Sequence, residues 1–77
     1  MNTPFYLKDA IVGQRVRIHE LHSGPELCTR LRELGFCENA VVRCMTVGDT
    51  AIICEVCNTR IGLNSSLAGN ISVMAMD

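Results

Sequence analysis

The fold is decided by residues 23–36, which read SGPELCTRLRELGF and predict a short amphipathic helix over about residues 25–34. Ser23 followed three residues later by Glu26 is typical of a capping box, which gives the helix a defined start. Gly35 can adopt the positive φ of a C-cap and ends the helix. A helix this short is only marginally stable alone in water, so it must pack against another part of the chain.

Leucines are expected to supply the packing face of this helix. Leu27, Leu31 and Leu34 recur at helical spacing and predict one apolar stripe that is buried in the core. Phe36 follows the C-cap and is expected to anchor the chain beside the stripe.

Length and composition predict one small domain with an aliphatic core. Of the 77 residues, 48% are hydrophobic, but only two Phe and one Tyr are aromatic. The net charge of -1 argues against binding to nucleic acid. The sequence shows no signal peptide and no apolar run long enough to cross a membrane, so we expect a cytoplasmic protein. We assign residues 1–77 to a single domain with its core in residues 7–74.

Outside the helix, the chain shows the period-two pattern of short strands. The segments predicted as strands are residues 14–21, 41–46, 51–56, 60–63 and 71–74. Helix-capping residues at 64–66 predict one further turn of helix near residues 65–68. In so small a chain, about five or six short strands with one inserted helix favour a mostly β, partly closed barrel. The inserted helix would cover one open end of this barrel.

Five cysteines, at positions 28, 37, 44, 54 and 57, raise the question of a metal site. Their odd number and the missing export signal favour free thiols over disulfides. Cys54 and Cys57 have the C-x-x-C spacing of metal sites and are candidate ligands for Fe(II) or Zn(II). In the simpler interpretation, Cys44 and Cys54 are small apolar residues on strands. His19 and His22 would lie on opposite faces of a continuous strand, so joint ligation would need a turn between them.

No catalytic constellation is recognisable in the sequence. The chain lacks a Ser, His and acid set on converging elements, a P-loop and an H-E-x-x-H motif. We therefore expect a protein that is not an enzyme.

Several segments resemble the FeoA family, the small cytosolic partners of the bacterial ferrous iron uptake system. The segments that carry this resemblance are LKDAIVGQRVRI at 7–18, RLRELGF at 30–36, RIGL at 60–63 and LAGNISV at 67–73. Together they extend over nearly the whole chain and keep the order found in the family.

The resemblance implies an SH3-like barrel that binds FeoB, a GTPase-linked membrane iron transporter, at its cytosolic face. Such a module would act by binding one state of its partner more tightly than another. On the polar helix face, Arg30, Arg32 and Glu33 are either partner contacts or simply solvated. Phe5 and Tyr6 either pack over the barrel mouth or form an exposed docking patch. Unpaired barrel edges could also join two copies into a homo-oligomer.

A second function remains open on the sequence alone. The chain could be a transition-metal-binding or metal-sensing module that uses cysteine or histidine ligands. Such a module would resemble the SH3-like domain found at the end of some iron-dependent repressors.

Overall fold

The computed structural model describes residues 3–76 and forms one curled antiparallel sheet with two α-helices. In chain order, the elements are β1 (Phe5–Tyr6), the 3-10 helix η1 (Leu7–Asp9), β2 (Arg15–Leu21), α1 (Pro25–Glu33), β3 (Val41–Val47), β4 (Ala51–Val56), β5 (Thr59–Asn64), α2 (Ser65–Ala68) and β6 (Ile71–Ala75). Neither helix has the length and apolarity needed to span a bilayer within the described residues.

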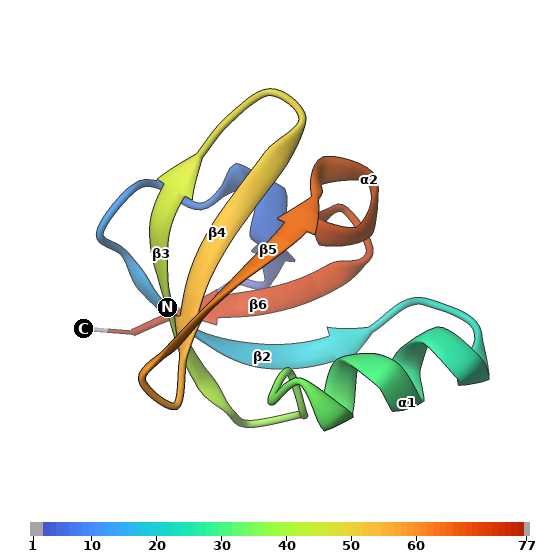
Figure 1. The fold of residues 1–77 in the computed structure, drawn as a ribbon. Coiled ribbons are helices and arrows are strands. Elements are labelled where there is room, and N and C mark those ends of the chain that lie inside the picture. The colour runs from blue at the N-terminus through green and yellow to red at the C-terminus, as the bar shows by residue number, and fades with distance from the viewer. Residues whose placement is uncertain (1–2, 77) are drawn as a thin grey trace.

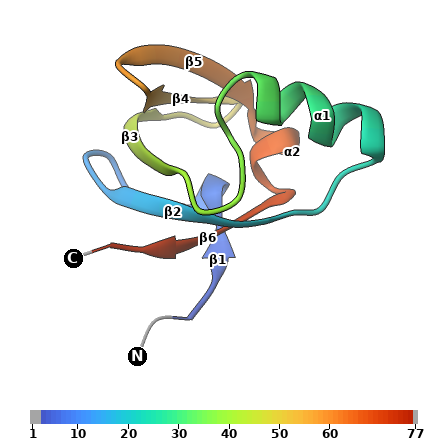
Figure 2. The ribbon, with the colours of Figure 1, turned by 90° about the horizontal axis from the view of Figure 1, so that it is seen from below.

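The sheet has the strand order β1-β6-β2-β3-β4-β5, and each neighbouring pair is antiparallel. It curls until β3, β4 and β5 lie over β1, β2 and β6, and α1 lies outside the curled sheet (Figure 1 and Figure 2). The end strands β1 and β5 do not pair with each other, so the barrel is partly closed, as expected.

The five strands predicted from the sequence are confirmed to within one residue at each end, and so is the helical turn at 65–68. The side chain of Asn64 caps this turn by accepting a hydrogen bond of 2.7 Å from the backbone N–H of Leu67.

β1 is an additional strand, too short to show a period. It pairs Phe5 with Val73 and packs Phe5 against the core, whereas Tyr6 is 43% exposed. The two alternatives for this segment therefore apply to different residues.

A tight turn of two residues joins β4 to β5 and fixes their register. Cys57 and Asn58 have φ values of 51° and 64°, as the two central residues of a type I′ hairpin require. The turn sets Glu55 opposite Arg60 and Val56 opposite Thr59. This register then determines the cross-strand partner of every later residue of β5.

The core is aliphatic apart from one aromatic ring, as the composition predicted. Phe36 is its largest fully buried side chain, and every strand except the short edge strand β1 contributes residues that are buried. Cys44 and Cys54 are fully buried on facing positions of β3 and β4, which confirms that they are apolar core residues.

The C-terminal end of α1 forms a Schellman motif that carries Phe36 into this core. Gly35, with a φ of 105°, donates to the carbonyl of Arg32 at 3.1 Å, and Phe36 donates to the carbonyl of Leu31 at 2.9 Å. A Cβ atom on Gly35 would lie 2.6 Å from Cγ1 of Val56. Glycine is therefore required here both for its conformation and for its size.

The predicted capping box is wrong, because the helix begins one residue later than the box requires. The N-cap is Gly24, whose carbonyl accepts the backbone N–H of Cys28 at 2.9 Å, and no side chain caps the helix. Ser23 precedes the N-cap, and its hydroxyl is buried without a hydrogen-bond partner within the described residues.

The predicted leucine stripe is also wrong in two of its three members. Leu31 is buried, but Leu27 and Leu34 are 37% and 43% exposed. The buried face is instead formed by Cys28 and Leu31. Successive residues are about 100° apart around a helix, so a face centred between these two leaves Leu27 and Leu34 at its edge.

Leu31→Ala is expected to lower the free energy of unfolding by roughly 2–5 kcal/mol, because it leaves a cavity in the core. Leu34→Ala, which removes a side chain that is already partly solvated, should lower it by less than about 1 kcal/mol. Urea unfolding followed by circular dichroism measures both. Equal losses for the two variants would contradict the helix orientation described above.

Candidate functional site

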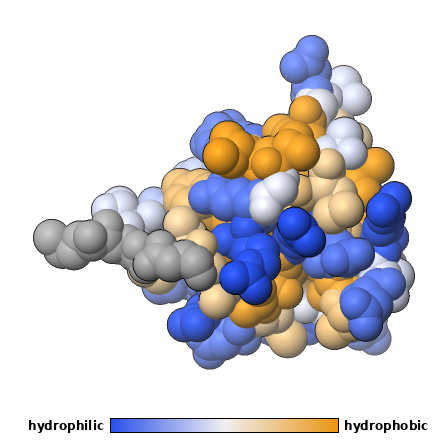
Figure 3. Space-filling model, turned by 90° about the vertical axis from the view of Figure 1, so that its left-hand side faces the viewer, coloured by the Kyte–Doolittle hydropathy of each residue, from blue (hydrophilic) through white to orange (hydrophobic). Residues whose placement is uncertain are grey.

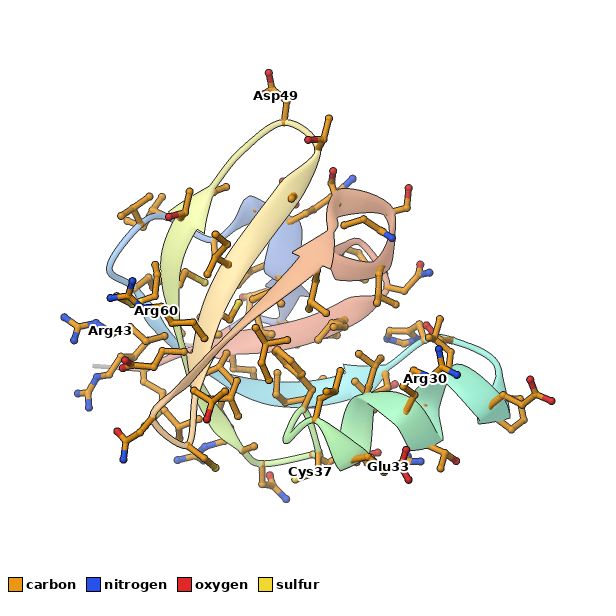
Figure 4. The ribbon with its side chains drawn as sticks, in the orientation of Figure 1. Arg30, Glu33, Cys37, Arg43, Asp49 and Arg60 are labelled. Carbon is orange, nitrogen blue, oxygen red and sulfur yellow. The ribbon has the colours of Figure 1, made fainter. Side chains whose placement is uncertain are left out.

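The outward side of α1 combines apolar and charged groups that the core does not use. We call Leu27, Arg30 and Leu34 the α1 outer face, since their spacing places them on one side of the helix. Leu27 and Arg30 line an open hollow together with Glu26, and Figure 4 shows Arg30 reaching out from the helix. Within residues 3–76, Arg30 forms no side-chain hydrogen bond or ion pair.

Arg32 and Glu33, the other two candidates on this helix, differ in their surroundings. Arg32 makes a bidentate pair with Glu38, from Nε to Oε1 at 3.2 Å and from Nη2 to Oε2 at 2.9 Å. Its hydrogen bonds lower the pKa of the Glu38 carboxyl to about 2. Arg32 therefore ties α1 to the loop that follows it. Glu33 is exposed and is the last residue of α1.

An exposed cluster of one carboxylate and two imidazoles lies at the end of β2. A β-bulge at His19 shifts the pairing of β2 with β6 and turns His19 toward Glu20. The Nε2 atoms of His19 and His22 lie 3.5 Å and 3.6 Å from the two oxygens of Glu20. The ring of Tyr6 meets His22 edge-on, with 6.1 Å between ring centroids. The bulge and the strand end thus gather two histidines that a continuous strand would separate.

The C-x-x-C pair is split between two environments. Cys54 points into the core, whereas Cys57 is exposed in the β4–β5 turn. The neighbouring Cys44 thiol, together with burial, raises the pKa of the Cys54 thiol above its ordinary range and keeps it protonated. Over residues 3–76, no three His, Cys, Asp or Glu side chains, including His19, Glu20 and His22, are arranged so that they could hold a metal ion.

Thiol reactivity should follow this division. In the native, reduced protein, iodoacetamide is expected to modify Cys37 and Cys57 first, because both are exposed. Cys28, Cys44 and Cys54 are buried and should react only after denaturation. Mass spectrometry of peptides from a time course measures the order, with a sample in denaturant as the control. Early modification of Cys54 would contradict its burial.

Arg32→Gln is expected to raise the pKa of Glu38 from about 2 toward its ordinary value of 4.5, since it removes the paired guanidinium. A carboxyl group whose pKa is lowered in the folded state stabilises the fold at pH values above its ordinary pKa. This contribution is lost as the pH falls toward 2. Titration of the Glu38 carboxyl carbon by NMR measures the shift, with Arg30→Gln as the control. An unchanged midpoint would show that the ion pair does not form in solution.

The chain was compared with known families and structures. A model of the FeoA domain matches residues 5–75. Among curated protein sequences, none matches the chain significantly.

Several solved structures share the fold. An iron uptake regulatory protein, FeoA, superposes with a TM-score of 0.89 at 19% identity and covers 96% of this chain and 100% of its own. Iron(II) transport protein A from Clostridium thermocellum has a TM-score of 0.86 at 26% identity, covering 94% of this chain and 46% of its own. A manganese-dependent transcriptional repressor reaches 0.87 at 14% identity, covering 99% of this chain and 44% of its own.

The likeness to the first and third of these structures concerns the fold alone, because their sequences have diverged so far. It confirms the expected SH3-like architecture. The family model is the stronger finding, since it extends from β1 to the end of β6. The chain therefore belongs to the FeoA family.

Proposed function

We propose that this protein is a non-enzymatic accessory module of ferrous iron uptake, and that it acts by binding a FeoB-type membrane transporter at its cytosolic face. Membership of the FeoA family supports a role connected with iron transport. The similarity to an iron(II) transport protein of Clostridium thermocellum agrees with this role.

The observation that carries the proposal is the α1 outer face. Leu27 and Leu34 expose more than a third of their surface on either side of Arg30. Burying partly exposed leucines against a partner is favourable by about 25 cal/mol per Å² of apolar surface removed from water. An arginine between two apolar side chains is also a typical centre of a protein interface, since its guanidinium can form bidentate pairs with carboxylates.

The geometry favours docking over metal sensing. The candidate thiols Cys54 and Cys57 face different environments, and the described residues offer no group of three metal ligands. A docking module needs only a surface that is complementary to one on its partner. Its effect on the transporter is limited by the difference in its affinity for the partner's conformational or nucleotide states.

The double variant Leu27→Ser/Leu34→Ser should lose most of its co-purification with the detergent-solubilised transporter of the same cell, because the apolar part of the contact is gone. Arg30→Ala alone should weaken the association by about tenfold or more, as typical interface arginines do. Ile53→Thr is the matched control, because Ile53 is 38% exposed, close to the 37% of Leu27, and lies on β4.

Quantitative pull-down measures the bound fraction, and circular dichroism confirms that each variant is folded. Wild-type binding by the double variant would exclude the α1 outer face as the contact. Absence of binding by the folded wild-type protein would contradict the proposed function itself.

A further inference from the structure

A row of charged side chains crosses the outer face of the sheet, away from the α1 outer face. Arg15 on β2 lies directly opposite Arg43 on β3, Arg43 opposite Glu55 on β4, and Glu55 opposite Arg60 on β5. All three arginines are exposed, and Figure 4 shows Arg43 and Arg60 projecting from the same side of the barrel. We call Arg15, Arg43 and Arg60 the arginine row.

The arginine row carries an unbalanced positive charge. Like charges directly opposite each other in an antiparallel pair destabilise the sheet, and Arg15 and Arg43 are such a pair. Glu55 is the one acidic residue in register with them, and Arg17 adds a further exposed cation on β2. No carboxylate of residues 3–76 lies within 4.0 Å of a guanidinium nitrogen of these arginines. The Arg15–Arg43 pair is unfavourable, whereas Glu55 forms favourable cross-strand pairs with Arg43 and Arg60. The row keeps a net positive charge that negative charge on a partner would neutralise.

An apolar turn adjoins the arginine row. Ile11 and Val12, between η1 and β2, are 69% and 64% exposed, more than any other large hydrophobic side chain described. The turn is held by hydrogen bonds from Gly13 N–H to the carbonyl of Cys44 at 2.7 Å and from Gln14 N–H to that of Ile11 at 3.0 Å. The turn is therefore fixed against Cys44, the residue that follows Arg43 on β3. On this side of the molecule, hydrophobic surface lies beside strongly hydrophilic surface (Figure 3).

We propose that this face binds an acidic, extended segment of a partner protein. Carboxylates of the segment would pair with Arg15, Arg43 and Arg60, and an apolar side chain would pack on Ile11 and Val12. Alternate residues of an extended chain lie about 6.6 Å apart on one side, a spacing that long arginine side chains on neighbouring strands can match. The proposal does not depend on the identity of the transporter and concerns a surface separate from the α1 outer face.

Protein carboxylates fit this surface better than a phosphate backbone does. The whole chain has a net charge of -1, and Glu55 within the row would repel a continuous line of phosphates. No aromatic residue lies in the row or in the adjoining turn to stack on a base. A peptide can place its carboxylates on either side of Glu55 and an uncharged residue opposite it.

Titration of the isotope-labelled protein with short peptides tests the proposal by NMR. The first probe alternates Glu and Ser with a central Leu, the second replaces each Glu by Gln, and the third is a short single-stranded RNA. The first peptide is expected to shift amide resonances of β2 to β5 and the turn at Ile11, more strongly at low salt. Arg43→Gln/Arg60→Gln should weaken this binding by about tenfold or more, whereas the control Lys8→Glu, which lowers the net charge by the same two units, should leave it unchanged.

The outcomes separate this inference from the proposed function. Equal affinity of the double arginine variant, equal binding of the Gln peptide, or tighter binding of the RNA would overturn it. Thermal unfolding of Arg43→Gln is a second readout, because the substitution removes both the repulsion with Arg15 and the attraction to Glu55 and should leave the melting temperature nearly unchanged. A marked fall would overturn the inference by showing that Arg43 has a stabilising role within the fold. None of these results bears on transporter binding through α1.

Discussion

The structure depends on the turn at Gly35, which carries Phe36 from the end of α1 into the barrel. Its Schellman hydrogen bonds join Phe36 to Leu31, so that one helical and one loop side chain enter the core together. A small domain has little stability to lose, and an aliphatic core with a single aromatic ring relies on that ring to fill its centre. The close approach of Val56 leaves no room for any other residue at Gly35. Helix position and barrel packing are therefore set by the same few atoms.

Anchoring along one narrow face explains why α1 leaves an exposed surface for the proposed partner. The C-terminal half is held by Leu31, by the Schellman turn and by the ion pair of Arg32 with Glu38. Toward the N-terminus, Cys28 is the buried residue, and its thiol donates to the carbonyl of Ser23 at 3.2 Å. Leu27 and Arg30 are left facing solvent. The helix is thus fixed in place by a narrow contact, and its remaining sides are available for binding.

Much of the fold could be predicted because its signals are local. Alternation, and for residues 51–56 a nearly continuous apolar run, identified five strands. The capping preference of Asn64 identified the turn of helix that follows β5. The errors arose where tertiary packing decides between local alternatives. Ser23 has the residue type of an N-cap, but the chain enters the helix at Gly24, and the helix turns Cys28 rather than Leu27 toward the core. The arginine row was harder to predict, because it exists only through the register of neighbouring strands, which no single segment encodes. The bulge that gathers His19 and His22 around Glu20 is another such feature.

The two-residue turn at Cys57 and Asn58 has a consequence for how this chain can diverge. Adding or removing one residue there would rotate every following side chain of β5 to the opposite side, placing Arg60 inside and Leu63 in water. The exposed loop between Val47 and Ala51 carries no such penalty, because length changes in surface loops cost little. Insertions in relatives should therefore accumulate before β4 and be rare after it.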